Sequence, residues 1–169
     1  LQWLPVDCYI GGAEHATMHL LYARFITKAL RDGGYLDFDE PFIKLYHQGT
    51  ITKKGSKMSK SRGNTVSPDE FIEKYGSDTF RAYIMFMGPY NEGGDWNDTG
   101  ITGVVRFMNK IWKFCHLPNS ENETDKKDLQ ILHQTIQSVT NDLHQMKFNT
   151  AISRLMECMN HFAGHTDVQ

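Results

Sequence analysis

The order of strand-like and helix-like segments at the start of the chain most strongly restricts its fold. Residues 6–10 contain β-branched and aromatic side chains and end at Gly11-Gly12, which predicts a short buried strand. Residues 13–31 carry apolar side chains at helical spacing, and residues 43–47 form a second strand candidate. Strand, helix and strand in this order predict a right-handed parallel crossover, the unit of a doubly wound α/β sheet.

Glycines and polar residues follow both predicted strands. Gly11 and Gly12 come after the first strand, and Gln48 and Gly49 come after the second. In doubly wound sheets, ligands bind beyond the carboxyl ends of the strands. Glycine allows a close approach of the backbone, and the free N–H groups at a helix start favour polar or anionic atoms. We therefore expect a ligand site at these two strand ends.

A basic segment follows, with the sequence Lys-Met-Ser-Lys-Ser at residues 57–61. Residues 53–64, the KMSKS loop, hold five positive charges and no acid, although the formal net charge of the chain is −2. Ammonium groups, hydroxyls and backbone N–H groups together suit a polyphosphate, and glycines on either side act as hinges. The alternative is a basic loop that is merely solvated.

Three of these segments together closely resemble class I aminoacyl-tRNA synthetases. They are Gly-Gly-Ala-Glu-His-Ala at residues 11–16, Gln48-Gly49, and Lys-Met-Ser-Lys-Ser at residues 57–61. His19 and the residues 20–25 that follow it make the chain most similar to leucyl-tRNA synthetases. The order and spacing of the segments make this resemblance specific.

The resemblance extends from residue 5 to residue 151 and implies a fold. Residues 1–98 would form the second half of a doubly wound, Rossmann-like nucleotide-binding domain, which includes the KMSKS loop. Residues 99–169 would begin an α-helical bundle of the anticodon-binding type. The family's H-I-G-H signature and its large editing insertion do not occur in the sequence, and the chain starts at Leu1. We therefore expect a piece of a longer protein that needs the first half of the catalytic domain as its partner.

The resemblance also implies an activity for the parent enzyme. Such an enzyme activates leucine with ATP to leucyl-adenylate and then transfers leucine to tRNA(Leu), and Mg²⁺ accompanies the ATP. We expect this chain to be inactive alone. Two alternatives remain: another synthetase of the isoleucyl, valyl or methionyl type, and a catalytically silent fragment that binds tRNA or protein.

The KMSKS loop supplies the catalytic candidates. Lys57 and Lys60 are expected to contact the phosphates of ATP as negative charge builds on the leaving pyrophosphate. Ser59 and Ser61 add hydroxyl donors, and Met58 is expected to pack the loop onto the protein. Three further cations either assist with the phosphates or contact the tRNA backbone: Lys53, Lys54 and Arg62.

The residues expected to hold ATP or the adenylate lie at the strand ends. A carboxylate at Glu14 suits a ribose diol, and His15 is a second ribose or adenylate partner. The resemblance implies that Gly11, Gly12, Glu14 and His15 bind the adenosine ribose, that Gln48, Gly49 and Ile51 hold the adenine, and that His19 lines the amino-acid pocket.

Each of these assignments has a simpler alternative. His15 and His19 are four residues apart on one predicted helix face, so they also suit zinc, but no third ligand is evident and we expect no metal site. His19 alone also suits a structural role in the core. Glu14 also suits the positive end of a helix dipole, and Gln48-Gly49 also suits a plain turn after a strand.

The rest of the chain reads as helices. Ser67 starts a capping box with Pro68 in the first turn, Ser77 is expected to cap the next helix, and a longer helix begins near Thr99. Residues 118–128 form a polar connection, and residues 129–162 predict two helices with a break near residues 147–149. Three interpretations concern side chains in this part. Trp96 packs rather than stacks on a ligand. Arg106, Lys110 and Lys113 share one side of a helix, where they contact a tRNA backbone or face solvent, and Leu155, Met159 and Phe162 belong to the core.

Composition agrees with a globular protein of the cytoplasm. Hydrophobic residues make up 40% of the chain and charged residues 22%. No segment reaches the roughly 18 consecutive apolar residues that a membrane-spanning helix requires, so no membrane partner is expected. Cys8, Cys115 and Cys158 are far apart and suit reduced thiols rather than a disulfide framework.

Overall fold

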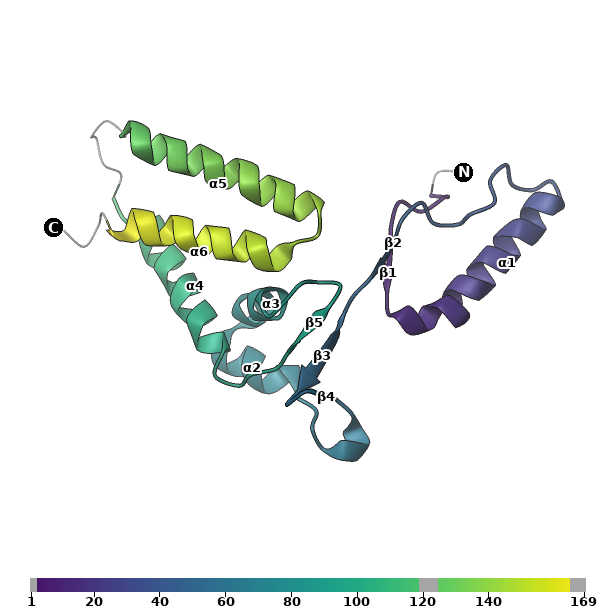
Figure 1. Ribbon diagram of the computed structural model, residues 1–169, viewed down its shortest axis with the longest axis horizontal. Coiled ribbons are helices and arrows are strands. Elements are labelled where there is room, and N and C mark those ends of the chain that lie inside the picture. Colours follow the sequence, from purple (N-terminus) through teal and green to yellow (C-terminus); the bar gives the residue numbers. More distant parts are fainter. Residues whose placement is uncertain (1–2, 119–124, 165–169) are drawn as a thin grey trace. The chain divides into compact units, whose positions relative to one another are not determined.

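The computed structural model describes residues 3–118 and 125–164, and the chain divides into two compact units, Leu1–Gly49 and Thr50–Gln169 (Figure 1). The first unit contains β1 (Tyr9–Gly11), the 3₁₀ helix η1 (Ala13–Thr17), α1 (His19–Asp32) and β2 (Leu45–His47). The second unit contains β3 (Thr50–Lys53), β4 (Ser56–Lys57), the 3₁₀ helix η2 (Lys60–Arg62), α2 (Pro68–Tyr75), α3 (Ser77–Phe86), β5 (Gly93–Asp95), α4 (Ile101–Cys115), α5 (Lys126–His144) and α6 (Phe148–Gly164).

The first unit is a parallel strand pair joined by a helix. β1 and β2 pair in parallel, with Tyr9 opposite Leu45 and Gly11 opposite His47. The predicted strand, helix and parallel strand are therefore confirmed, although both strands are shorter than predicted. An isolated bridge between Val6 and Phe42 continues the pairing direction before β1.

The predicted continuous helix over residues 13–31 is wrong. The segment starts as the 3₁₀ helix η1 and becomes α-helical only at His19. Met18 separates the two pieces, because its dihedral angles, φ −119° and ψ −106°, are far from helical values. His15 and His19 consequently do not lie on successive turns of one α-helix, as the sequence interpretation assumed.

The second unit has a three-stranded sheet in the order β4-β3-β5. β3 and β4 form an antiparallel hairpin, and both residues of its turn have positive φ: 55° at Lys54 and 70° at Gly55. Such a two-residue turn with left-handed angles matches the twist of a β-hairpin. β5 then pairs in parallel with β3 after the chain has passed through α2 and α3.

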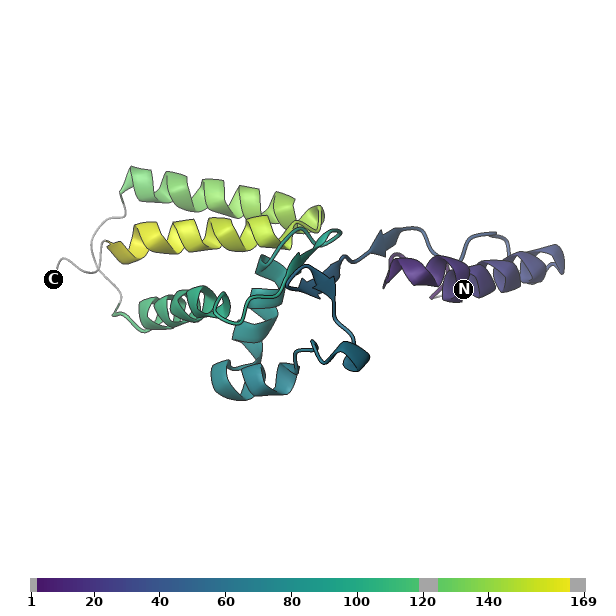
Figure 2. The same cartoon turned by 60° about the horizontal axis from the view of Figure 1, so that its bottom comes forward.

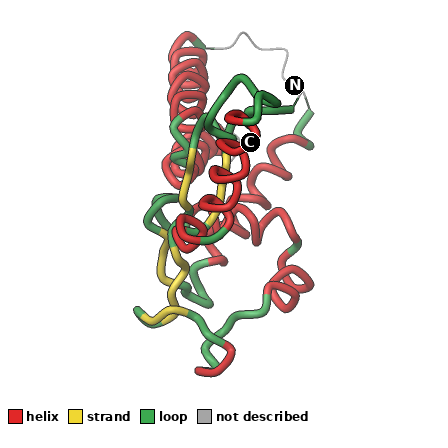
Figure 3. The backbone as a smooth tube through the Cα atoms, turned by 90° about the vertical axis from the view of Figure 1, so that its right-hand side faces the viewer, coloured by secondary structure: helices red, strands yellow, loops and turns green. Residues whose placement is uncertain are grey.

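These strands correct the prediction that residues 53–64 form only a loop. The KMSKS loop starts within the hairpin, and Figure 3 shows the two strands followed by the short helical turn η2. β3, β4 and β5 were not predicted, because they contain only four, two and three residues, too few to give an alternating pattern of apolar and polar side chains.

The helix starts differ in detail from the predicted caps. Pro68 occupies the first turn of α2 as predicted, but the Ser67 side chain makes no capping hydrogen bond. Ser77 is the first residue of α3 rather than its cap, and Gly76 holds the cap position with φ 85°. Ser67 therefore occupies the predicted cap position of α2 without the predicted bond. The prediction for Ser77 is wrong, because the chain enters α3 directly from the Gly76 turn.

The core of the second unit lies where α3, α4 and β5 meet. Ile101 and Val104 are 0% and 1% exposed, and they cluster with Phe80, Tyr83 and Trp96. The Tyr83 hydroxyl donates a 2.7 Å hydrogen bond to the carbonyl oxygen of Asn97. The interpretation of Trp96 as a packing residue is confirmed.

α5 and α6 lie side by side as an antiparallel pair (Figures 1 and 2). The break between them falls at residues 145–147, close to its predicted position, and Met146 adopts φ 58° there. Arg154 and Asp142 form a 2.7 Å ion pair across the two helices. Leu155 is 39% exposed, so its assignment to the core is wrong: it lines an open pocket together with residues of α3 and α5.

Two predictions concern the chain around α5. Asp125 caps this helix, so its first turn replaces the end of the polar connection predicted at 118–128. The middle of that connection, residues 119–124, lies outside the described residues. Among the helices that the structure describes, none is long and apolar enough to cross a membrane.

Candidate functional site

In the first unit, the two glycine-containing strand ends lie next to each other. Gly11 pairs with His47 in the parallel register, so Gly12 and Gln48 leave the sheet at the same edge. His47 donates from Nδ1 to the Gly11 carbonyl oxygen over 2.9 Å, which ties the two ends together. The prediction that these strand ends meet is confirmed. His47 was missed, because nothing in its local sequence distinguishes it from an ordinary strand residue.

Glu14 folds back over Gly12. A Cβ atom on Gly12 would lie 2.6 Å from the carboxyl carbon of Glu14, so a side chain at Gly12 would require the carboxyl group to move. Glu14 is exposed and stands in the first turn of η1. This arrangement presents a carboxylate directly above the strand end, where it can accept hydrogen bonds from two neighbouring hydroxyls.

His15 stands beside this carboxylate on η1. Its Nδ1 atom is buried and has no hydrogen-bond partner among the residues that the structure describes. A buried ring nitrogen without a partner is unfavourable unless a ligand or water satisfies it. The chemistry of the position therefore suits a polar ligand group.

His19 packs among aromatic rings. Its Nδ1 lies 3.0 Å from the Tyr9 hydroxyl, and its ring stacks on that of Tyr9 with centroids 5.4 Å apart. Phe42 completes the cluster: its ring centroid lies 4.7 Å from that of Tyr9 and 6.2 Å from that of His19. The His15 and His19 rings remain neighbours at 6.5 Å despite the break at Met18. Over residues 3–118 and 125–164, no group of three or more His, Cys, Asp or Glu side chains is arranged to hold a metal ion.

An ion-pair network fixes α1 to the segment before β2. Arg24 donates from Nε and Nη2 to the two carboxylate oxygens of Glu40 at 2.8 and 2.7 Å, and Lys28 donates to the same carboxylate at 3.1 Å. The hydrogen bonds from Arg24, followed by those from Lys28, lower the pKa of Glu40 to about 2. This network could not be predicted from the sequence, because its partners are 12 and 16 residues apart across a loop.

In the second unit, the KMSKS loop is closed on itself by Asn64. The Asn64 side chain accepts a 2.8 Å hydrogen bond from the Ser59 amide and donates a 3.3 Å bond to the Lys57 carbonyl oxygen. Ser59 and Ser61 join through their hydroxyls at 2.8 Å. Gly63 then takes φ 62°, which lets the chain turn back toward Asn64.

Met58 and the lysines of the loop point to different environments. Met58 packs against the core of the second unit, which confirms its predicted role. Lys57 and Lys60 are exposed, together with Ser61, and Ser59 is half-buried. The arrangement therefore anchors the loop by its apolar residue and leaves two ammonium groups available to an anion. Lys53 differs, because it lies 3.8 Å from Asp98 in an ion pair.

Asp95, at the end of β5, contacts the β3–β4 hairpin from the side of β3 that lies opposite β4. Its Oδ1 accepts a 2.6 Å hydrogen bond from the Thr52 hydroxyl and a 2.9 Å bond from the Gly55 amide. The Thr52 hydroxyl and then the Gly55 amide lower the pKa of Asp95. Asp95 was also missed, since its partners are 43 and 40 residues away in the sequence.

The predicted site residues thus fall into two groups, one in each unit. The first unit contains Gly11, Gly12, Glu14, His15, His19, Gln48 and Gly49. The second unit carries Ile51, Lys57, Ser59, Lys60 and Ser61. Ile51 lies in β3, where it pairs with Gly94 of β5, and its side chain packs against the core.

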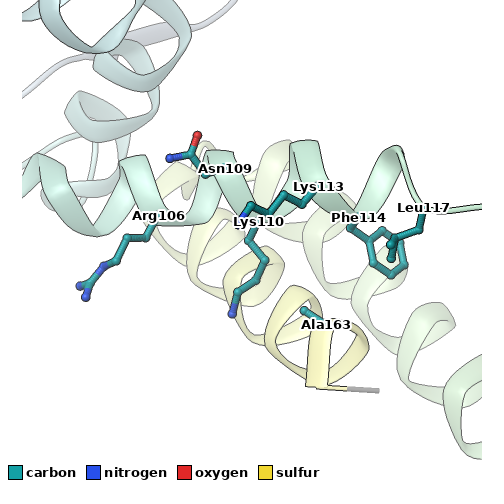
Figure 4. Close-up of a pocket in the computed structure, with 7 residues that line it drawn as sticks. All are labelled: Arg106, Asn109, Lys110, Lys113, Phe114, Leu117 and Ala163. Atoms are coloured by element: carbon teal, nitrogen blue, oxygen red, sulfur yellow. The ribbon is translucent and has the colours of Figure 1, made fainter. Parts of the chain in front are cut away.

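α4 and α6 enclose a separate basic pocket (Figure 4). Its volume is about 530 Å³, and its lining residues are Arg106, Asn109, Lys110, Lys113, Phe114, Leu117 and Ala163. Lys110 donates a 2.7 Å hydrogen bond to Asn160 on α6, which places its ammonium group between the helices. The prediction that the three cations share one side of a helix is confirmed.

Comparison with known proteins gives consistent matches. The family model of class I tRNA synthetases (I, L, M and V) matches residues 2–97. The leucine–tRNA ligase of Petrotoga mobilis is 54% identical over 94% of this chain and 21% of its own length. The leucine–tRNA ligase of Thermotoga maritima is 53% identical over 95% of this chain and 21% of its own length. The chain therefore spans 21% of the length of both curated relatives.

A solved structure resembles the chain as well. It is the agnB2 LeuRS of Agrobacterium radiobacter K84 in a ternary complex with tRNA and LeuAMS. This structure matches with a TM-score of 0.81 and 38% sequence identity, over 92% of this chain and 22% of its own chain. The match supports the same arrangement of strands and helices in the two proteins.

Proposed function

This chain belongs to the class I tRNA synthetases of the I, L, M and V group, and we propose that it supplies the second half of the catalytic domain of a leucine–tRNA ligase. Residues 1–98 form that half, and residues 99–169 begin the helical domain. The observation that carries the proposal is the similarity to leucine–tRNA ligases over nearly the whole chain, through both groups of candidate site residues. The parent enzyme activates leucine with ATP and transfers it to tRNA(Leu).

The first unit binds the adenosine of ATP and of leucyl-adenylate. Gly11 and Gly12 allow the ligand to approach the strand end, and the Glu14 carboxylate accepts hydrogen bonds from the ribose hydroxyls. His15, next to Glu14 on η1, offers its imidazole as a second partner for the ribose or the adenylate. The backbones of Gln48 and Gly49 hold the adenine edge.

The aromatic cluster next to the strand ends receives the amino acid. Tyr9, His19 and Phe42 provide an apolar wall, and the contact of His19 with the Tyr9 hydroxyl fixes the orientation of its ring. The rings of Tyr9 and Phe42 give this wall its apolar surface, which suits the side chain of leucine.

The KMSKS loop stabilises the departing pyrophosphate. Lys57 and Lys60 neutralise the negative charge that develops when the leucine carboxylate attacks the α-phosphate, and the Ser59 and Ser61 hydroxyls donate to phosphate oxygens. Mg²⁺ enters with the ATP and supplies further charge neutralisation. Lys54 and Arg62 are additional cations of the same loop.

The helical part contributes a surface for the tRNA. Arg106, Lys110 and Lys113 line one pocket between α4 and α6, and such a group of cations suits the phosphates of a nucleic-acid backbone. The separated, free cysteines suit the reducing cytoplasm, where tRNA charging takes place. The first half of the catalytic domain remains the expected partner of the first unit.

A chimera tests the proposal. This chain would replace the matching segment of the Petrotoga mobilis leucine–tRNA ligase, and ATP–pyrophosphate exchange would be measured with leucine, isoleucine, valine and methionine. We expect exchange with leucine that exceeds exchange with the other three by at least about 100-fold, since an amino-acid site rejects a misshapen side chain by this order of magnitude.

Each other outcome has a definite meaning. Exchange that prefers isoleucine, valine or methionine would assign the chain to another member of the group. A folded chimera without exchange, when the unaltered Petrotoga mobilis enzyme is active, would favour a fragment that binds tRNA or protein without catalysis.

A further inference from the structure

The strand that carries Lys57 has little support of its own. β4 contains two residues, Ser56 and Lys57, and it lies at the edge of a three-stranded sheet. A two-residue ladder is marginal in water, because few hydrogen bonds compensate for the lost backbone entropy. The turn before it adds strain, since Lys54 is not a glycine and yet has φ 55°.

Asp95 supplies the missing support. Thr52 pairs with Lys57 on one side and with Asp95 on the other, so these three residues form one row across β4, β3 and β5. Residues paired in this way place their side chains on the same face of the sheet. The Asp95 carboxylate therefore reaches both the Thr52 hydroxyl, at 2.6 Å, and the Gly55 amide of the strained turn, at 2.9 Å.

We infer that Asp95 is a positioning residue for Lys57: by holding the hairpin turn, it fixes the strand from which Lys57 meets the phosphates. The inference rests on the proposed function, because the phosphate role of Lys57 is part of it. Hydrogen bonds to an ionised carboxylate are shorter and stronger than neutral ones, and both donors belong to β3 or its turn. The lowered pKa of Asp95 keeps this carboxylate ionised near neutral pH.

A positioning role predicts that only one step of the reaction depends on Asp95. Lys57 acts while pyrophosphate leaves, so adenylate formation needs its exact placement. Transfer of leucine from a finished adenylate to tRNA involves no pyrophosphate and should not need it. A general loss of stability would instead affect both steps together.

The test compares Asp95→Asn in the chimera with Glu73→Gln, a matched change at an exposed carboxylate on α2. The two measurements are leucine-dependent ATP–pyrophosphate exchange and single-turnover transfer to tRNA from synthetic leucyl-adenylate. For Asp95→Asn we expect the kcat of exchange to fall about 10- to 100-fold, since displacement of a charge-stabilising group by about 1 Å has effects of this size. Transfer should stay within about twofold of the parent chimera, and Glu73→Gln should alter neither step.

Asp95→Asn removes the negative charge of the acceptor but keeps an oxygen there, and Thr52→Val provides an independent variant that removes one of the two donors. It should lower exchange in the same selective way, and the double variant should lose less than the product of the two single losses, because both changes weaken the contact between Thr52 and Asp95. Equal losses of exchange and transfer, or exchange at the parent rate, would overturn the positioning role. A parent chimera that shows no exchange would overturn the proposed function itself, and the inference with it.

Discussion

His47 and Gly11, which are 36 residues apart in the sequence, are joined by a 2.9 Å hydrogen bond from the histidine Nδ1 to the glycine carbonyl oxygen. The bond connects the ends of the two parallel strands on which the adenosine site is proposed. The bond also defines the tautomer of His47. Because Nδ1 donates to a carbonyl oxygen, it carries the proton, and Nε2 is available as an acceptor when the ring is neutral.

Replacement of His47 should therefore weaken ATP binding. For His47→Leu in the chimera, we expect the KM for ATP to rise about 3- to 10-fold, which corresponds to the loss of one buried hydrogen bond of about 0.5–1.5 kcal/mol. The measurement is ATP–pyrophosphate exchange at varied ATP. His116→Leu is the matched control, because His116 makes a similar bond to the Trp112 carbonyl oxygen on α4. Equal KM values in the two variants would show that the strand-end bond has no role in binding.

Asn64 should support the geometry of the KMSKS loop. Asn64→Ala removes the hydrogen bonds that link the loop to itself at Ser59 and Lys57, so both lysines should lose their fixed positions. We expect the kcat of exchange in the chimera to fall about 10-fold or more, because lysines without fixed positions stabilise the leaving pyrophosphate less well. Asn91→Ala, at an exposed position outside the loop, is the control. An exchange rate within twofold of the parent would contradict this role.

Glu40 should make the stability of the chain depend on pH under acidic conditions. The hydrogen bonds from Arg24 and Lys28 lower the pKa of Glu40 from 4.5 to about 2 in the folded state. Because the pKa of Glu40 is lower in the folded state than in the unfolded state, its ionised carboxylate stabilises the fold. This stabilisation is fully present above about pH 4.5 and is lost as the pH falls from about 4.5 to about 2.

The measurement is the thermal midpoint of the chain between pH 6 and pH 2.5. Wild type should lose more stability on acidification than Glu40→Gln, whose side chain does not titrate, and Glu73→Gln should follow wild type. The difference should shrink at high salt, since the side chains of Arg24 and Glu40 are 54% and 43% exposed. If the thermal midpoints of wild type and Glu40→Gln fell in parallel with pH, the ionised Glu40 carboxylate would not contribute to stability.

Ile101 should be the most sensitive aliphatic position in the second unit. Its side chain is 0% exposed, so Ile101→Ala should lower the free energy of unfolding by about 2–5 kcal/mol, and Ile101→Val by about 0.5–1.5 kcal/mol. Ile136→Ala is the control, because Ile136 is 52% exposed and should lose far less. Urea unfolding of the chain, followed by tryptophan fluorescence from buried Trp96, measures the differences. Similar losses at the two positions would place the core elsewhere.

The sequence predicted the parts of the fold that local patterns determine. β-branched and aromatic residues followed by glycine predicted β1, and the parallel pairing with β2 followed from the helix between them. β5 escaped prediction because Gly93, Gly94 and Asp95 have little intrinsic strand preference, and they become a strand only by pairing with β3. Gly93 is required there, since a Cβ atom on it would lie 2.7 Å from Thr50 backbone atoms.

The same distinction applies to the candidate site. Lys57, Lys60 and Glu14 were predicted because their chemistry stands out in a short segment of sequence. His47 and Asp95 were not, because each acts on a partner at least 36 residues away, and only the folded strands bring the partners together. The break at Met18 was equally hidden, since the segment around it contains no proline or glycine until Gly33.

The most direct test of the account is leucine-dependent ATP–pyrophosphate exchange by the chimera with Lys57→Ala and Lys60→Ala. Each change should lower kcat about 100-fold or more, the usual loss when a group that stabilises developing charge is removed, and should leave the KM for leucine nearly unchanged. Lys44→Ala, at an exposed lysine just before β2, should exchange at the parent rate. Exchange within twofold of the parent in both loop variants would contradict the proposal that this loop acts on the phosphates of ATP.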